Sequence, residues 1–160
     1  MMDLVLGIGG NQGNRVENLE KIRNRIEKQF GRILKKSPLI ESEPWGFESE
    51  SWFLNQVVLV KCELEPLMIL KIIHKIESEF GRVRTGKYED RLVDIDILLY
   101  GELILNDAEL QIPHPHLHKR LFIMKPLVEI IPDFIHPVFH KSLREILSTC
   151  TDKSVCKWYS

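Results

Sequence analysis

The sequence predicts an α+β fold, on the basis of the order and spacing of its apolar residues. Apolar runs with the character of strands alternate with two stretches of helical spacing, and further helical patterns follow towards the C-terminus. The resulting order, β-α-β-β-α-β, is the ferredoxin-like arrangement with a mainly antiparallel sheet. Two helices can cover one face of the sheet and the C-terminal helices the other. We therefore expect three layers (α/β/α) in a single domain over 1–160.

The first half of the chain predicts a strand, a capped helix and a second strand. Residues 3–8 form the first strand and lead into a glycine-rich turn. Asn14 caps the helix that follows, with Glu17 at the capping-box position. A second strand is expected over 33–41. Residues 42–52 show neither helical nor strand periodicity and are expected to form a loop. The apolar face of the helix consists of Leu19, Ile22, Ile26 and Phe30, before Gly31 ends it.

The second half begins with the clearest strand, over 53–62. Pro66 then opens a helix at a position where its missing N–H costs little. The residues from 82 to 91 form a mostly basic loop. The apolar face of the helix is expected to contain Leu67, Leu70, Ile73, Ile76 and Phe80, before Gly81 ends it. The remaining expected elements are strands over 93–100 and 103–105 and helices over 120–131 and 142–147.

Composition excludes several classes of protein. Lys and Arg number 22 against 23 Asp and Glu, a net charge of −1, so we expect neither nucleic acid nor a membrane as a partner. No segment has the ~20 apolar residues of a membrane helix, and the N-terminus lacks the positive charge of a signal peptide. Cys62, Cys150 and Cys156 are an odd set that indicates free thiols in a reducing compartment. We expect a monomeric, cytoplasmic protein.

Asp94 and Asp96 give the strongest chemical signal. They stand in an apolar strand, and because side chains alternate along a strand, both carboxylates project from one face with Cα atoms ~6.6 Å apart. Burying two bare carboxylates costs several kcal/mol, and a divalent cation removes that penalty. Mg²⁺ prefers one or two carboxylates with phosphate oxygens and water, and two ions ~3.5–4 Å apart could share this pair. The alternative is a solvated edge strand with outward aspartates.

A basic loop directly precedes this strand. Arg82, Arg84, Lys87 and Arg91 stand within a few residues of the two aspartates, and arginine suits bidentate contact with phosphate. Together the two features predict a polyphosphate site, and the alternative for the loop is a solvated surface. The loop also fits G-x-x-x-x-G-K. However, Tyr88 replaces the Ser or Thr that holds Mg²⁺, and the motif follows a helix instead of a strand, so we reject a P-loop.

Asn55 shares one strand face with Phe53. A buried amide needs hydrogen-bond partners, and a flat heterocycle stacked on Phe53 would supply them. The alternative is an amide near a strand end that reaches water. Downstream, His114, His116 and His118 stand between prolines as H-x-H-x-H. Because neither a cysteine nor another clear ligand accompanies them, we prefer contact with phosphate, or exposure in a loop, to a zinc site.

These residues occur in an order and spacing that resemble the 6-hydroxymethyl-7,8-dihydropterin pyrophosphokinase family of folate biosynthesis over almost the whole chain. Each motif is short, and their combination is what makes the resemblance specific. The matching motifs are Gly9-Gly10-Asn11, Ser42-Glu43-Pro44-Trp45-Gly46, Phe53-Leu54-Asn55, Ile76-Glu77, Gly81-Arg82-Val83-Arg84, Arg91-Leu92-Val93-Asp94-Ile95-Asp96-Ile97, Pro113-His114 and Arg120-Leu121-Phe122.

The resemblance implies an enzyme that transfers diphosphate from ATP to the pterin hydroxymethyl oxygen, with release of AMP. It implies that Asp94 and Asp96 bind two Mg²⁺ ions and that Arg82 and Arg91 contact the phosphates as the site closes. The positions that match ATP-binding residues of the family are His74, Glu77, Arg84, Tyr88, Ile97, His114 and Arg120. Those that match pterin-binding residues are Ser42, Pro44, Trp45, Phe53, Asn55 and Phe122, with the two phenylalanines as the stacking pair.

The chain departs from the family pattern close to these positions. Glu89-Asp90-Arg91 stands where the family usually has Gly-Pro-Arg, in a loop shorter by one residue than in some members. Gly10, Glu43 and Pro115 replace a frequent Ser, Pro and Tyr, respectively. These changes concern the ATP contacts and the closure of the loop, and they spare the two aspartates. Two rival functions remain, a metal-dependent nucleotidyltransferase and a non-catalytic ligand-binding module.

Overall fold

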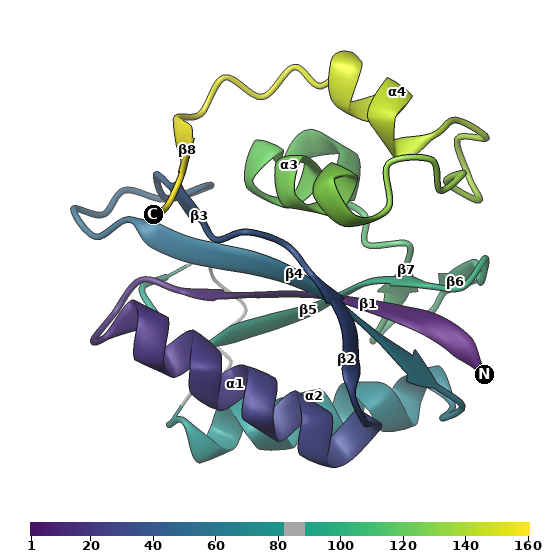
Figure 1. Cartoon of the computed structure of the whole chain (residues 1–160), viewed down its shortest axis with the longest axis horizontal. Helices are drawn as coiled ribbons and strands as arrows, with labels where there is room; N and C mark the ends of the chain where they lie inside the picture. The colour runs from purple at the N-terminus through teal and green to yellow at the C-terminus, as the bar shows by residue number, and fades with distance from the viewer. Residues whose placement is uncertain (82–88) are drawn as a thin grey trace.

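The computed structural model describes residues 1–81 and 89–160 and centres on one antiparallel sheet (Figure 1). Its strands are β1 (Met2–Gly10), β2 (Ile33–Lys36), β3 (Ile40–Ser42), β4 (Phe53–Cys62), β5 (Asp94–Tyr100) and β8 (Cys156–Trp158), while β6 (Leu105–Asn106) and β7 (Gln111–Ile112) form a separate hairpin. The strands of the sheet run in the order β5-β1-β4-β3-β8, and β2 also pairs with β4. This topology confirms the predicted ferredoxin-like arrangement.

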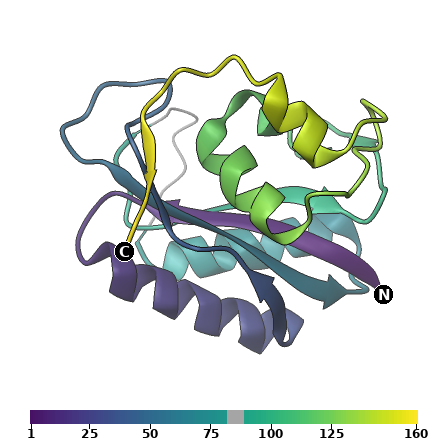
Figure 2. The same ribbon diagram turned by 45° about the horizontal axis from the view of Figure 1, so that its top comes forward.

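Helices cover both faces of the sheet, as the sequence predicts. They are α1 (Arg15–Phe30), α2 (Pro66–Glu79), the 3-10 helix η1 (Leu117–Lys119), α3 (Leu121–Ile130) and α4 (Leu143–Ser148). Helices α1 and α2 lie on one face, and α3 and α4 lie on the other (Figures 1 and 2). The alternation of side chains along the strands therefore divides the core into two parts, one under each helical layer.

Helix α1 begins at the predicted cap and ends at the predicted glycine, but the Glu17 side chain pairs with Lys21 and does not complete a capping box. The Oδ1 atom of Asn14 accepts a hydrogen bond from the backbone N–H of Glu17 at 3.1 Å, which satisfies one of the free donors at the start of the helix. The Glu17 carboxylate pairs with Lys21 at 3.0 Å. Gly31 ends the helix with a φ of 101°, a backbone conformation that favours glycine.

The buried face of α2 differs from the prediction at Leu67. The Leu67 side chain is 41% exposed, whereas Ile69, Ile73 and Ile76 are buried. Because successive helical residues are rotated by ~100°, Leu67 stands ~200° from Ile69 and faces away from the sheet. The apolar stripe of the helix therefore starts at Ile69.

The single strand expected over 33–41 is divided into β2 and β3. Pro38 has no N–H to donate, so the ladder cannot continue through it. Ser37 bridges the gap instead. Its N–H donates to the carbonyl of Val57 at 2.9 Å, and its Oγ accepts from the N–H of Val57 at 3.0 Å.

The C-terminal third also differs from the prediction. The strand expected over 103–105 is shifted to Leu105–Asn106, because its partner in the hairpin is Gln111–Ile112. Strand β8 is not predicted by the sequence, since a strand of three residues in a polar segment offers too little alternation to detect. It pairs with β3 and extends the edge of the sheet.

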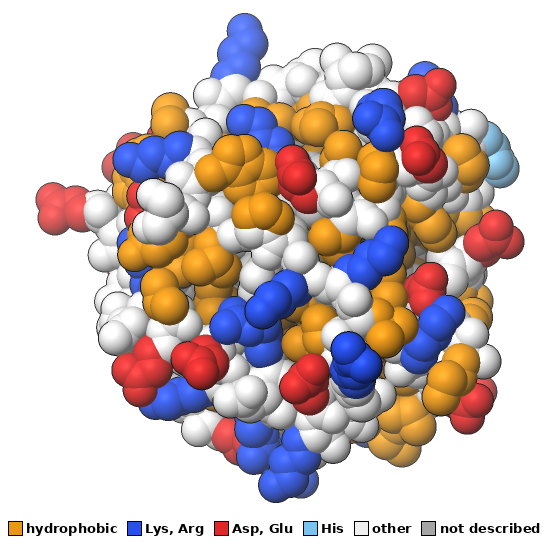
Figure 3. Space-filling model, viewed as in Figure 1, with side chains coloured by type: hydrophobic (Ala, Val, Ile, Leu, Met, Phe, Trp, Pro, Cys, Tyr) orange, Lys and Arg blue, Asp and Glu red, His pale blue; other side chains and the backbone are white. Residues whose placement is uncertain are grey.

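Figure 3 shows one face of the molecule, on which basic, acidic and hydrophobic side chains are interspersed. This mixture agrees with the balanced composition of the chain, whose net charge is −1. Within residues 1–81 and 89–160, no helix combines the length and the apolar character that crossing a bilayer requires.

Candidate active site

Strand β5 places Asp94 and Asp96 on the face of the sheet that α3 covers. Between them, Ile95 points into the opposite core below α1 and α2. The buried carboxylate of Glu77 accepts a hydrogen bond from the N–H of Ile95 at 3.1 Å, so α2 fixes the backbone between the two aspartates. β5 is an edge strand of the sheet, but both aspartates are half-buried and line a pocket beside Phe122 of α3.

Glycines of β1 lie between the two aspartates of β5 and Asn55 of β4. In the antiparallel register Gly9 lies opposite Asn55 on one side and Asp94 on the other, and Gly7 lies opposite Asp96. A β-carbon at Gly9 would stand 2.3 Å from Oδ1 of Asn55, so a larger residue cannot occupy this position without displacing the amide. The glycine-rich end of β1 therefore allows the Asn55 amide to approach the backbone of β1 closely.

Arg91 connects the aspartates to the aromatic side of the site. Its Nη1 lies 3.3 Å from Oδ1 of Asp94, and its Nε donates to the carbonyl of Glu89 at 3.0 Å. The guanidinium carbon also lies 5.6 Å from the centre of the Phe53 ring. The side chain is only 11% exposed. The guanidinium of Arg91 thus contacts both a predicted metal ligand, Asp94, and the ring of Phe53, which is predicted to stack on the pterin.

A cavity of about 480 Å³ adjoins the other side of Asp96. It contains four residues at predicted ATP positions or at the metal site, namely His74, Asp96, Ile97 and His114. The hairpin of β6 and β7 forms part of its wall through Glu109 and Gln111, two positions where the resemblance implies ATP contacts in some family members and where this chain differs from them. The remaining lining residues are Leu70, Ile95, Asp107, Ala108, Leu110 and Pro115.

His114 is held neutral in this cavity. Its Nδ1 accepts a hydrogen bond from the N–H of His116 at 3.1 Å, so Nε2 carries the proton and is a donor. Burial lowers the pKa of His114 to about 4, with further lowering by the charges of Arg120 and His116, while Asp94 opposes the shift. The neutral ring can therefore donate one hydrogen bond to an anionic ligand without carrying a charge.

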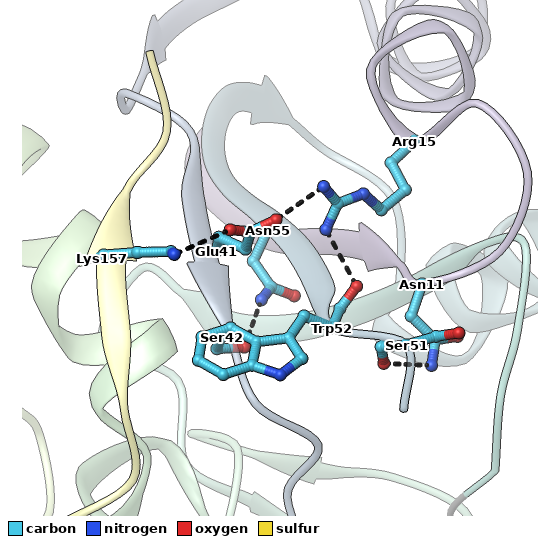
Figure 4. Close-up of polar contacts among 8 residues, drawn as sticks. All are labelled: Asn11, Arg15, Glu41, Ser42, Ser51, Trp52, Asn55 and Lys157. Carbon is cyan, nitrogen blue, oxygen red and sulfur yellow. Dashed lines mark hydrogen bonds and ion pairs between the residues drawn. The ribbon is translucent and has the colours of Figure 1, made fainter. Parts of the chain in front are cut away.

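The polar side of the expected pterin pocket is formed by β3 and β4. Nδ2 of Asn55 donates to Oγ of Ser42 at 3.0 Å, and both residues are buried (Figure 4). Asn55, Phe122 and the two aspartates line a small pocket of about 20 Å³. Asp96 lines both this small pocket and the cavity of about 480 Å³. It therefore lies where the two predicted ligand sites meet.

Aromatic and cationic side chains surround this pocket. The ring of Phe47 meets that of Phe53 edge-on, with centres 6.0 Å apart. Arg120 is buried, and its guanidinium carbon lies 4.4 Å from the centre of the Trp45 ring and 5.7 Å from that of Phe122. Pro44 is half-buried beside Trp45.

The loop before β4 is fastened by contacts that the sequence did not reveal. Arg15 pairs with Glu41 at 2.6 Å and donates to the carbonyl of Trp52 at 3.0 Å, and Lys157 of β8 lies 3.8 Å from the same glutamate (Figure 4). Asn11 donates to the carbonyl of Ser51 at 3.0 Å. These partners lie far apart in the sequence, so only the fold brings them together.

The three histidines of H-x-H-x-H do not converge. The ring of His116 lies 5.7 Å from that of Trp45, whereas the ring of His118 packs edge-on against Phe139 with centres 4.7 Å apart. Among the residues that the structure describes, no three His, Cys, Asp or Glu side chains are grouped so as to hold a metal ion. Arg82, Arg84 and Tyr88, also expected at the site, lie outside the described residues.

The two aspartates suit Mg²⁺ better than they suit a metal whose ligands all come from the protein. Asp94 and Asp96 offer two carboxylates on one face, beside a cavity with room for a nucleotide. Mg²⁺ is commonly held by one or two carboxylates together with substrate phosphates and water. The pair therefore suits a cation that arrives with a phosphorylated substrate.

Solved structures with a similar fold include the HPPK-DHPS proteins of *Plasmodium falciparum*. A structure determined with pteroate superimposes with a TM-score of 0.78 at 18% identity and covers 92% of this chain and 44% of that chain. A second HPPK-DHPS structure, in complex with substrates, gives a TM-score of 0.76 and covers 43% of that chain. At this level of identity the likeness supports the fold alone.

Sequence comparison gives closer relatives. The chain is 41% identical to the 2-amino-4-hydroxy-6-hydroxymethyldihydropteridine pyrophosphokinase of *Aquifex aeolicus*, over 98% of this chain and 97% of that protein. It is 40% identical to the *Porphyromonas gingivalis* enzyme of that name, of which it spans 95%. It is 33% identical to the folic acid synthesis protein fol1 of *Schizosaccharomyces pombe* but spans only 21% of that protein.

A protein-family model matches most of the chain. It is described as 7,8-dihydro-6-hydroxymethylpterin-pyrophosphokinase, and it matches residues 5–132, which include both aspartates and the expected pterin positions. The chain therefore belongs to the 7,8-dihydro-6-hydroxymethylpterin-pyrophosphokinase family.

Proposed function

We propose that this chain transfers the diphosphoryl group of ATP to the hydroxymethyl oxygen of 6-hydroxymethyl-7,8-dihydropterin and releases AMP, as a pyrophosphokinase of folate biosynthesis. The observation that carries the proposal is the position of Asp96. It lines both the cavity of about 480 Å³ and the small pocket that contains Asn55 and Phe122. A donor and an acceptor bound in these two places would meet at the aspartates.

The reaction requires positioning and charge neutralisation more than covalent chemistry by the protein. Asp94 and Asp96 would hold two Mg²⁺ ions, which when bound supply positive charge to the triphosphate. The neutral His114 would donate its Nε2 proton in a hydrogen bond to a phosphate oxygen in the cavity. The hydroxymethyl oxygen would attack the β-phosphorus in line with the departing AMP, so that the new O–P bond forms as the bond between the β-phosphorus and the α,β-bridging oxygen breaks, and the hydroxyl proton passes to water.

Arg91 would change partners during the reaction. Its guanidinium contacts Asp94 and lies over the Phe53 ring. A pterin stacked on Phe53 and a cation bound to Asp94 both require the places that this side chain occupies. We propose that the guanidinium turns to the phosphates when the substrates bind, where its donors suit bidentate contact.

The remaining expected residues divide between the two ligands. For the pterin, Asn55 and Ser42 would bind the polar edge of the ring, Phe53 and Phe122 would stack on its faces, and Trp45 and Pro44 would close the pocket. For ATP, His74 and Ile97 would line the cavity, whereas Glu77 supports β5 from below. The proposed ATP contact of Arg120 rests on the family pattern. So do the roles of Arg82, Arg84 and Tyr88, outside the described residues.

The test is incubation with MgATP and 6-hydroxymethyl-7,8-dihydropterin, followed by product analysis. We expect AMP and the diphosphorylated pterin. Asp94→Asn and Asp96→Asn should each lower turnover by about 100-fold or more, because they remove charge from the phosphate site. Asp133→Asn changes an exposed aspartate far from the site and is the matched control.

Other products would contradict the proposal. Pyrophosphate with a nucleotidylated acceptor would indicate a nucleotidyltransferase, and no conversion of ATP would indicate a binding module. Near-normal turnover in both aspartate variants would overturn the metal assignment. The monomeric state and the cytoplasmic location belong to the same proposal, and the free thiols of Cys62, Cys150 and Cys156 support a reducing compartment.

A further inference from the structure

The Asn11 side chain joins segments of the chain that are otherwise unconnected. It is only 4% exposed and lies just after β1. Its Nδ2 donates to the carboxylate of Asp90 at 2.7 Å and to the carbonyl of Ser51 at 3.0 Å, and its Oδ1 accepts from the N–H of Arg91 at 2.8 Å. The N–H of Asn11 also donates to the carbonyl of Arg91 at 2.9 Å. The contact with Ser51 is visible in Figure 4.

These bonds fix the backbone on both sides of Arg91. One peptide group of Arg91 is held through its N–H and the other through its carbonyl, and both partners belong to the same asparagine. Ser51 precedes Phe53 by two residues, so the same amide also holds the start of the strand that carries the stacking ring. Asn11 thus sets the spacing between the backbone of Arg91 and that of the loop before β4, which contains Ser51.

Gly10 makes this arrangement possible. A β-carbon at position 10 would stand 2.2 Å from the carbonyl oxygen of Leu92 and 2.9 Å from its carbonyl carbon. The segment before β5 therefore packs directly against the backbone of β1. That close approach brings Arg91 within hydrogen-bonding distance of Asn11.

We infer that Asn11 is a positioning residue for the transfer reaction and acts through Arg91, an inference that rests on the proposed function. With the backbone of Arg91 fixed, only its guanidinium has to move between the Asp94–Phe53 position and the phosphates. Misplacement of a group by about 1 Å can cost about 100-fold in rate, so a loosened backbone should affect the chemical step more than the binding of ATP.

The first test compares Asn11→Ala with Asn14→Ala. The former removes the three side-chain bonds, and we expect kcat to fall by about 10- to 100-fold while the dissociation constant of MgATP changes by less than about threefold. Asn14→Ala removes the cap of α1 and should lower the melting temperature without changing kcat. An unchanged kcat in Asn11→Ala, or an equal loss in both variants, would overturn the inference.

The second test exchanges donor and acceptor. Asn11→Asp places a carboxylate against Asp90, and we expect a loss of kcat similar to that of Asn11→Ala. Adding Asp90→Asn restores a hydrogen bond between the two positions with the same total charge, while an oxygen that accepts from the N–H of Arg91 is present in both variants and the bond to the carbonyl of Ser51 stays absent. We expect recovery of part of kcat, whereas a purely steric role for Asn11 predicts no loss in Asn11→Asp, because aspartate has the same shape as asparagine.

The third test separates this inference from the proposed function. In the ligand-free protein, the amide of Arg91 should exchange with solvent at least about tenfold faster in Asn11→Ala, because it loses its acceptor. If Asn11 acts through Arg91, the double variant with Arg91→Ala should be no slower than Arg91→Ala alone. Additive losses would contradict the inference and leave the proposed function intact, whereas a wild-type protein that forms no AMP would refute the proposed function itself.

Discussion

The amide of Asn55 donates to Ser42 and faces the pocket that also contains Phe122. If this amide binds the pterin edge, Asn55→Ala should weaken pterin binding by about 1–3 kcal/mol, because it removes hydrogen bonds from a buried site. The affinity for ATP should change little. Titration calorimetry with each ligand measures both effects. Asn24→Ala, on the exposed side of α1, is the matched control. Loss of ATP affinity with normal pterin affinity would contradict this role for Asn55.

At the scale of residues, alternation along the strands made part of the site predictable. Asp94 and Asp96 could be placed on one face of their strand, and Asn55 on one face with Phe53, because the period of a strand fixes side-chain direction, whereas the relation between the two strands came from the structure. The contacts of Asn11 could not be predicted, because its partners Ser51 and Asp90 are 40 and 79 residues away in the chain. Local sequence patterns carry no signal for such long-range bonds.

At the scale of elements, the start of α3 depends on a residue from the C-terminal segment. Arg120 at the N-cap makes no side-chain capping bond, and Asp152 instead accepts from the N–H of Leu121 at 3.0 Å. Burial alone would raise the pKa of Asp152, but hydrogen bonds from Ser154 and from the N–H of Leu121 outweigh it, and the pKa is lowered. The carboxylate is thus held ionised at the positive end of the helix.

Replacing this cap should destabilise the protein. We expect Asp152→Ala to lower the free energy of unfolding by about 0.5–2 kcal/mol, the usual cost of losing a cap, and Asp152→Asn to cost less because it retains an acceptor. Urea denaturation measures the difference. Asp133→Ala, on the surface, should change the free energy by less than about 0.5 kcal/mol. Equal stability of Asp152→Ala and wild type would show that water replaces the carboxylate without cost.

Elements with strong periodicity were predictable, and short ones were not. The prediction of Phe53–Cys62 is confirmed to the residue, because an apolar run of this length has few alternatives. The division at Pro38 and the short strand β8 depend on pairing with β4 and β3, which a local pattern does not encode. The strand expected over 103–105 was misplaced for the same reason, because its position depends on pairing with Gln111–Ile112.

At the scale of the whole molecule, buried histidines make stability depend on pH. His136 is 3% exposed, and its Nδ1 accepts from the N–H groups of Val138 and Phe139, each at 3.2 Å. Burial lowers the pKa of His136 to about 4, with smaller contributions from His118 and His140. The pKa of His114 is also lowered to about 4. Between about pH 4 and 6.5 the unfolded chain therefore binds more protons than the folded one.

Stability should consequently be highest above about pH 6.5 and fall as the pH is lowered towards 4, below which these two groups add no further change. We expect a loss of about 2–3 kcal/mol for each of the two histidines between pH 7.5 and 4.5 in the free energy of unfolding. His136→Gln should reduce this slope, even if it lowers stability at every pH. Urea denaturation at several pH values measures it, and an unchanged slope in the variant would exclude His136 as a source.

The global architecture was the most predictable part of the molecule. The order of strands and helices, two apolar helix faces and short connections leave few ways to cover both faces of one sheet. The motifs then indicated the family, which the match over residues 5–132 confirms. The cavity could not be predicted as a volume, because its shape results from how Asp96, His74 and the hairpin of β6 and β7 pack together.

The contact between Gly10 and the carbonyl of Leu92 has a consequence for the divergence of such proteins. A serine at position 10 would collide with the main chain of residues 91 and 92, so a side chain there requires this segment to shift. A chimera that imports either piece alone should open the junction between β1 and β5, whereas one that imports both should keep it closed. We expect the two pieces to be exchangeable only together, although almost half the chain separates them.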